Sequence, residues 1–262
     1  MLECSEVWRI VARFPSLSQI WDRRHIFKDC QVGFKQPWLN RLAEDPDEEI
    51  LSELENLDRY LGTLNVYAGF QKLVPRMRAR NNGSFASAVS EVKTAAWLRG
   101  FGVLISMYPE LASGEESDFL INVANQQIHG EVYEPRDLPS TRVSRGIVPI
   151  FLTHQKMEAP KRANILGRKG SRQLPSHVVG MWVSHIYHHP LVRSWVDFFE
   201  EDMKHRQNVL GVAFWVRSGS QMPAQCVPCQ GLVGDDHRIY WLDNNGCNNI
   251  LLQRRLLCCF IE

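Results

Sequence analysis

The chain has 262 residues, of which 44% are hydrophobic and 23% are charged, and its formal net charge is +1. This hydrophobic content can bury a large core, so the composition excludes a disordered chain and predicts one composite domain or two closely packed ones. The near-neutral balance excludes a chain that is basic or acidic throughout, and no apolar run approaches the length of a membrane span.

The amino-terminal residues lack the charged start and apolar stretch of an export signal. The chain has seven cysteines, an odd number. In a chain without an export signal, this count is most simply explained by reduced thiols. We therefore expect a cytoplasmic protein without a membrane partner.

Residues 1–80 predict a helical region. The acidic run from Glu44 to Glu49 leads into apolar residues at amphipathic helical spacing, namely Ile50, Leu51, Leu54, Leu57 and Leu61. A second helix is predicted from Asn65 to Met77, broken near Pro75. The predicted organisation is a helical region over 1–80, a core over 81–207 and a carboxy-terminal extension over 208–262.

A helix is predicted from Ser84 to Gly100. Ser84 is a good N-cap, and a glycine at the other end is typical of a helix C-terminus. Four apolar residues share one arc of this helix, and Glu91 lies at the edge of that arc. The Glu91 carboxylate is therefore expected to face inward.

Two strands with one acidic residue each follow this helix. Alternation places Asp118 opposite the apolar face of the first strand, and it groups Glu131 with His129 and Tyr133 on the second. A tight turn at Asn125–Gln126 would join them as a hairpin, with both carboxylates on one polar face. The alternative is that the acids are solvated surface residues.

The order of elements is informative. The helix is followed by a strand at Val103–Met107, the two acidic strands, a helix at Pro160–Arg172 and a strand at Val178–Ser184. This order resembles the PD-(D/E)XK, or restriction-endonuclease-like, phosphodiesterase superfamily over roughly residues 81 to 185. The resemblance implies an α/β fold with an αβββαβ core and a mixed central sheet.

The resemblance also implies functional residues. The acid of the family's first strand falls on Asp118, the acid of its second strand on Glu131, and the acid of the preceding helix on Glu91. Tyr133 stands where the family has a lysine, and Ser117 replaces the usual proline. The motif is therefore degenerate.

Phosphodiester hydrolysis needs charge stabilisation and a nucleophilic water, and a bound divalent ion supplies both. We expect Mg²⁺ or Mn²⁺ bound by Asp118, Glu131 and Glu91, with the Val132 carbonyl as a further ligand implied by the resemblance. Tyr133 is a poor base but an adequate hydrogen-bond donor. His129 could accept a proton, while Lys169 and Gln173 are the stronger candidates to approach the phosphate.

A basic segment follows the hairpin. Between residues 136 and 172 the basic side chains greatly outnumber the acidic ones. A local basic stripe beside a metal site favours a nucleic-acid partner, with DNA expected. The expected contacts are Arg162, Arg168, Lys169, Arg172 and Gln173. The alternative is a solvated helix face.

The remaining residues predict a helix over 191–207, a strand over 209–216, a loop-rich stretch over 217–237, a strand over 238–242 and a strand or short helix over 250–261. Cys226 and Cys229 have the spacing of zinc ligands, with His237 and Cys247 as partners. A single such pair is weak evidence, so we favour free thiols over a structural Zn²⁺.

Three functions follow from these observations. The leading one is a metal-dependent nuclease that hydrolyses phosphodiester bonds of DNA. The second is a catalytically inactive relative that binds nucleic acid or a protein partner, which the tyrosine at position 133 favours. The third is a zinc-stabilised interaction module. The sequence leaves open whether the chain forms a homo-oligomer.

Overall fold

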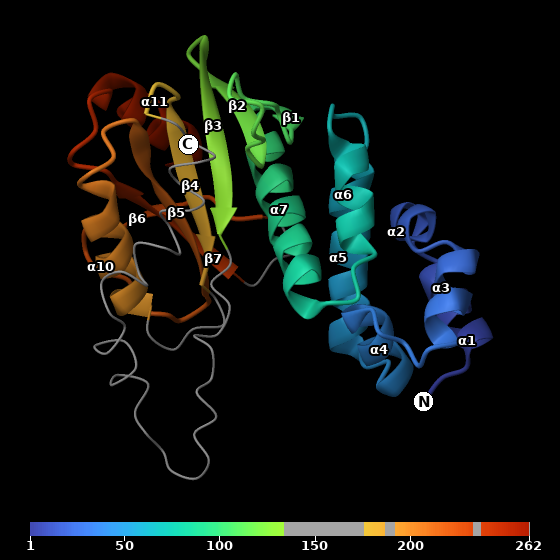
Figure 1. The fold of residues 1–262 in the computed structure, drawn as a ribbon. Helices are drawn as coiled ribbons and strands as arrows, with labels where there is room; N and C mark the ends of the chain where they lie inside the picture. Colours follow the sequence, from blue (N-terminus) through green and yellow to red (C-terminus); the bar gives the residue numbers. More distant parts are fainter. Residues whose placement is uncertain (134–175, 187–191, 233–236, 262) are drawn as a thin grey trace. The chain divides into compact units, whose positions relative to one another are not determined.

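The computed structural model describes residues 1–133, 176–186, 192–232 and 237–261 (Figure 1). It is a mixed α/β structure, which confirms the predicted class. The chain divides into two compact units, the first comprising Met1–Gly100 and Ser106–Tyr108 and the second Phe101–Ile105 and Pro109–Glu262. This division assigns the helix that carries Glu91 to the first unit, whereas the sequence analysis placed it in the core.

The first unit is helical. Its helices are α1 (Cys4–Val11), α2 (Pro15–Ile20), α3 (Arg23–Cys30), α4 (Pro37–Glu44), α5 (Glu48–Leu64), α6 (Phe70–Met77) and α7 (Asn82–Gly100). Helix α5 begins where the acidic run predicts, because the Asp47 side chain accepts a hydrogen bond from the Ile50 amide at 2.8 Å. The predicted break at Pro75 is wrong, since α6 continues through this residue.

Aromatic residues anchor the helices of the first unit. The Phe85 ring on α7 lies 6.1 Å from Trp21 and 5.4 Å from Trp38. The Trp21 indole donates to the Met77 carbonyl at 2.9 Å. Such pairs combine apolar burial with a satisfied polar group, so they fix how α7 packs within this unit.

A disulfide joins α1 to α3. Cys4 and Cys30 are bonded across 26 residues of sequence, with Cα atoms 5.8 Å apart. The prediction that all the thiols are reduced is therefore wrong for this pair. An odd number of cysteines does not exclude a disulfide, because the remaining five can stay free, as they are in this structure.

The second unit is built on a mixed sheet. The strands of this sheet are β1 (Leu104–Met107), of which only Leu104 and Ile105 are assigned to this unit, β2 (Phe119–Val123), β3 (Gln126–Tyr133), β4 (Gly180–His185), β5 (Val209–Arg217), β6 (Val227–Cys229) and β7 (His237–Asp243). Their spatial order is β1-β2-β3-β4-β5-β7-β6. The pairs β3–β4 and β4–β5 are parallel, and the pairs β2–β3, β5–β7 and β6–β7 are antiparallel.

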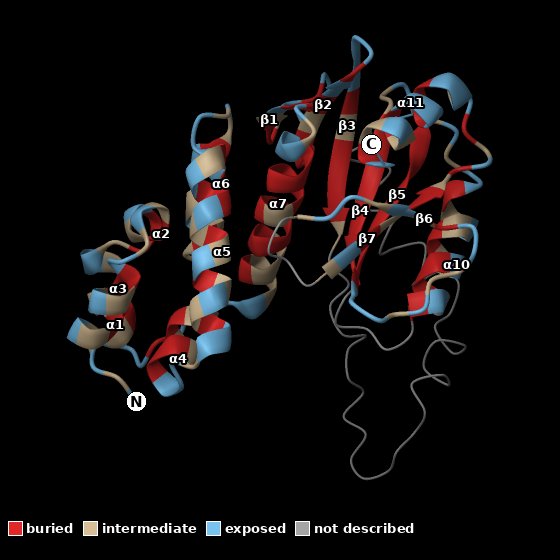
Figure 2. Ribbon diagram, turned by 180° about the vertical axis from the view of Figure 1, so that it is seen from behind, coloured by how far each residue is buried: buried red, intermediate tan, exposed pale blue. Residues whose placement is uncertain are grey.

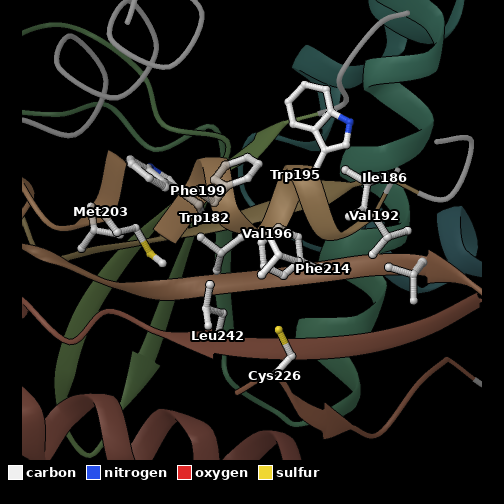
Figure 3. Packing of buried hydrophobic residues seen from close by; sticks show 13 residues of the cluster. Trp182, Ile186, Val192, Trp195, Val196, Phe199, Met203, Phe214, Cys226 and Leu242 are labelled. Atoms are coloured by element: carbon white, nitrogen blue, oxygen red, sulfur yellow. The ribbon is translucent and has the colours of Figure 1, made fainter. Parts of the chain in front are cut away.

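Two helices cover opposite faces of this sheet. Helix α10 (Val192–Met203) packs on Trp182, Phe214 and Leu242 in one apolar cluster (Figure 3). On helix α11 (Ile250–Ile261), the ring of Phe260 lies 5.6 Å from the ring of Trp241 on β7. Trp241 and Leu242 are consecutive residues of β7, so their side chains point to opposite faces of the sheet, and α11 covers the face opposite to α10. The central strands β4 and β5 are consequently buried along almost their whole length (Figure 2).

Several predicted elements need correction in detail. The hairpin turn is at Ala124–Asn125 and not at Asn125–Gln126, because both turn residues have positive φ, 51° and 64°, and Val123 pairs with Gln126. Of the two alternatives for residues 250–261, the structure has the helix, and the loop-rich stretch 217–237 also contains β6. The predicted helix Pro160–Arg172 lies outside the described residues.

Candidate metal centre

The hairpin β2–β3 positions the two acids that the sequence singles out. Phe119 pairs with Gly130, and a Cβ at Gly130 would lie 1.8 Å from the Phe119 ring. The missing side chain thus makes room for the ring of the opposite strand and sets the register. Asp118 directly precedes Phe119 and Glu131 directly follows Gly130, so the two acids flank the last residue pair of the hairpin.

Asp118 bonds to the chain on both sides of Glu131. Its amide donates to the Gly130 carbonyl at 3.0 Å, and its Oδ2 accepts from the Val132 amide at 2.7 Å. The side chain is therefore held by β3 itself and not by a flexible neighbour. Because one carboxylate oxygen receives this bond, the other is left to act as a ligand.

Both carboxylates are buried. Asp118 is 8% exposed and Glu131 is 3% exposed. The alternative of solvated surface acids is therefore wrong. A buried pair of neighbouring carboxylates is electrostatically unfavourable unless a positive charge or hydrogen-bond donors compensate it. Oxygen donors of this kind are what Mg²⁺ and Mn²⁺ prefer, so the donor set fits a hard divalent cation.

The face that carries Glu131 is covered by aromatic residues. Glu131 pairs with Trp182 of β4 in parallel register, and Tyr133 lies two residues further along β3 on the same face. The Tyr133 ring is 6.2 Å from Trp195 and 6.0 Å from Phe199, both on α10. Position 133 therefore has a ring that is packed under a helix.

Glu91 is bound within the first unit. Its carboxylate accepts two hydrogen bonds from the Arg76 guanidinium, the one to Oε1 at 2.5 Å, and a further one from the Tyr108 hydroxyl at 2.5 Å. It is 2% exposed. An ion-paired carboxylate would have to leave Arg76 to coordinate a cation, so these contacts favour a structural role in this state. Coordination by Glu91 stays a prediction.

His129 lies two residues before Glu131 on β3. Its Nδ1 is 2.8 Å from the Ser117 hydroxyl oxygen. Burial lowers the pKa of His129 below its usual range. The imidazole is therefore neutral at neutral pH, and its hydrogen bond with Ser117 fixes the ring beside the acids.

One cation that contacts the strand partner of Glu131 was missed by the sequence analysis. The Arg206 guanidinium lies 5.3 Å from the centroid of the Trp182 ring, and its Nε donates to the Asp202 carboxylate at 3.0 Å. Trp182 is the cross-strand partner of Glu131. Arg206 belongs to no recognisable motif and meets Trp182 only in the folded chain, so no local signal could have identified it.

The remaining predicted site residues fall into two groups. Arg162, Arg168, Lys169, Arg172 and Gln173 lie outside the described residues. Cys226 is buried in the apolar cluster under α10, and burial raises the pKa of both Cys226 and Cys229 to about 12. Thiols of this kind are poorly suited to bind zinc as thiolates.

Nowhere in the described part of the chain do three or more His, Cys, Asp or Glu side chains come together in a way that could hold a metal ion. Asp118 and Glu131 would therefore act as a pair, with water, a substrate phosphate or the main chain completing the ligand set. No helix in the described ranges has both the length and the apolar character needed to cross a membrane. Comparison with protein-family models, curated proteins and solved structures finds no match to this chain.

Proposed function

We propose that this protein is a metal-dependent nuclease that hydrolyses phosphodiester bonds of DNA. One observation carries the proposal: two buried acids on adjacent strands, with Asp118 bonded to the residues on both sides of Glu131. Burying two carboxylates side by side is costly for folding and is typical of a functional site. The order of helix, three strands and a further parallel strand supports the PD-(D/E)XK-like core.

Each residue of the site would have its own role in this reaction. Asp118 and Glu131 would hold Mg²⁺ or Mn²⁺, which supplies Lewis acidity and a nucleophilic water when bound. The Val132 amide holds the Asp118 carboxylate in place, so the ligand needs little reorganisation. The aromatic cover of Tyr133, Trp182 and α10 excludes water from one side of the acids.

A second function is favoured by a separate observation. Tyr133 is packed against Trp195 and Phe199, and Glu91 is ion-paired with Arg76. A nuclease of this family without its lysine and its helix acid can retain the fold and lose hydrolysis. The second candidate is therefore a catalytically inactive protein that binds nucleic acid or a protein partner.

Conservative substitutions at the acid pair test the proposal. Asp118→Asn keeps an oxygen that can accept the Val132 hydrogen bond, and Glu131→Gln keeps the shape of its side chain, so both variants should fold. Asp197→Asn, at an exposed position on α10, is the matched control. Each protein is incubated with labelled single-stranded and double-stranded DNA and RNA in Mg²⁺, in Mn²⁺ and in EDTA.

The proposal predicts metal-dependent cleavage of DNA by the wild type and the Asp197→Asn control, and a loss of at least about 100-fold in both acid variants. Binding without cleavage in either metal would select the inactive relative. Unchanged cleavage by both acid variants would remove the assignment of the site. Faster cleavage of RNA than of DNA would correct the substrate class and leave the site in place.

A further inference from the structure

Two arginines that follow α6 are docked on one side of α3. Nη2 of Arg78 lies 2.8 Å from Oδ2 of Asp22, and its Nε donates to the Ile20 carbonyl. Nε of Arg80 lies 2.9 Å from Oδ1 of Asp29. Positions 22 and 29 are two helical turns apart, so both carboxylates face the same side of α3 and hold the two guanidinium groups about 10 Å apart.

The carboxylate that holds Arg80 is itself fixed in the core. Asp29 is 0% exposed, and its Oδ2 accepts a hydrogen bond from the Gln36 amide at 2.9 Å. The Arg80 side chain is 45% exposed. A guanidinium has five N–H donors, so Arg80 can bind a second anion from solvent while Asp29 holds it in one orientation.

His25 lies between the two docked arginines. It precedes Asp29 by one turn on the same side of α3. Burial lowers the pKa of His25, and the charges of Arg78 and Arg80 lower it further against the opposing charges of Asp29 and Asp22. All four charged groups therefore cluster around this ring, and the positive charge here belongs to guanidinium groups that stay charged at every physiological pH.

A neighbouring row on α3 adds two more cations. Arg24 and Lys28 are exposed and are spaced by one helical turn. Lys28 is also one turn after His25, which places this row beside the docked arginines. We call Arg24, Lys28, Arg78 and Arg80 the cationic face of the first unit.

The spacing of these cations fits a polymer of repeating negative charge. A small anion is bound by donors that converge on one point, whereas the two docked guanidinium groups are held about 10 Å apart. Each strand of duplex DNA has one phosphate about every 3.4 Å along the helix axis, so this span covers about three nucleotides. Arginine forks also match the geometry of phosphate oxygens. Charge and spacing therefore both favour a nucleic-acid backbone.

We propose that the cationic face of the first unit binds the phosphate backbone of duplex DNA. The inference rests on the proposed function, which supplies the choice of DNA as the polyanion. It gives the helical unit a role of its own, since contacts to phosphates position a duplex without reading its sequence. Asp22 and Asp29 are then positioning residues that orient the two arginines.

The test measures binding of a labelled DNA duplex in EDTA over a range of salt concentrations. Arg78→Gln removes one guanidinium, and Asp22 is 47% exposed, so water can solvate the carboxylate that remains. Arg41→Gln is the matched control in the same unit. The Arg41 side chain is 37% exposed, against 34% for Arg78, but it is paired with three carboxylates.

Each lost phosphate contact should reduce the steepness of log K against log salt concentration by about 0.9. We expect this change in Arg78→Gln and in Arg24→Gln, and no change in Arg41→Gln. Arg80→Gln is combined with Asp29→Asn, which removes the buried charge that would otherwise be left unpaired. Adding Arg78→Gln to this pair should reduce the steepness by about 1.8 in total.

The slope separates a phosphate contact from a purely structural role. A variant that is only less stable has a smaller active fraction at every salt concentration, which lowers K and leaves the slope unchanged. Far-ultraviolet circular dichroism of each variant shows whether it is folded. If Arg78→Gln does not fold, Arg24→Gln, at an exposed position of the same face, decides by the same slope.

The outcomes for the cationic face and for the nuclease are distinguishable. Reduced slopes without metal-dependent cleavage by the wild type would support the face and refute the nuclease. Metal-dependent cleavage by the wild type, with wild-type slopes in folded Arg78→Gln and Arg24→Gln, would overturn the face and leave the nuclease in place. A wild type that does not bind the duplex at low salt in EDTA would also overturn the face.

Discussion

Gly130 is the position at which a single methyl group should disturb the hairpin most. A Cβ there would lie 1.8 Å from Cε2 and 1.9 Å from Cζ of Phe119. Ordinary carbon contacts are about 3.5–4.0 Å, so the ring must retreat by about 1.7 Å to accommodate alanine. Phe119 is 1% exposed, so the ring would have to move against the packed interior and not into solvent.

The magnitude of the effect follows from this geometry. Overpacking a closed core costs about 1–3 kcal/mol, and a collision with a fully buried ring belongs in the middle to upper part of that range. We expect Gly130→Ala to lower the free energy of unfolding by about 2 kcal/mol. For a unit of this size, that corresponds to a decrease in Tm of about 4–8 °C.

The assay is urea unfolding with two comparisons. Gly231→Ala is the matched control, since a Cβ there would meet the His237 carbonyl at an ordinary 3.6 Å. The second comparison adds Gly130→Ala to a Phe119→Leu background, in which the ring is absent and the methyl group should cost under about 1 kcal/mol. Equal costs of Gly130→Ala in the two backgrounds would refute the proposed collision.

Three further predictions concern the first unit. Arg76→Met should lower the free energy of unfolding by about 2–3 kcal/mol because it leaves the buried Glu91 carboxylate without its cation, and adding Glu91→Gln should restore part of this loss in urea melts. Cys4→Ser should lower the free energy of unfolding by about 3.5 kcal/mol, since it removes the disulfide that links Cys4 to Cys30 across 26 residues of sequence. A reducing agent should abolish the difference in unfolding free energy between this variant and the wild type. Burial, reinforced by the charge of a neighbouring arginine, lowers the pKa of His25, so the unfolded chain takes up the proton first and stability should fall as the pH drops below about 6.5. The urea midpoint of His25→Gln should depend less on pH over this range, and an equal dependence would contradict this explanation.

Much of the fold could be predicted from local pattern. The alternation in residues 117–133 identified both strands of the hairpin, and the Asp47 cap identified the start of α5. Errors arose where local rules compete. Pro75 was expected to break a helix, but it lies in the last turn of α6, and the turn shifted by one residue because Ala124 adopts a positive φ that its residue type does not favour.

Only the part of the candidate site that lies within one short stretch of sequence could be predicted. Asp118 and Glu131 lie in one hairpin, so the alternation in the sequence was enough to place them beside the pair Phe119–Gly130, and their sharing one face stays a prediction. That the face with Glu131 is buried under α10 could not be inferred, because it depends on Trp182 and Phe199, which lie far along the chain. The ion pair of Glu91 with Arg76 is likewise a tertiary contact between helices, so helix periodicity alone predicted only that Glu91 faces inward.

Titration of the purified protein with Mn²⁺, followed by electron paramagnetic resonance without nucleic acid, tests the central claim most directly. If Asp118 and Glu131 share one cation, the wild type and the Asp197→Asn control should bind one Mn²⁺ per chain at this site. Asp118→Asn and Glu131→Gln should each lose that binding while keeping the Tm of the wild type within a few degrees. Full Mn²⁺ binding by both acid variants would contradict the account.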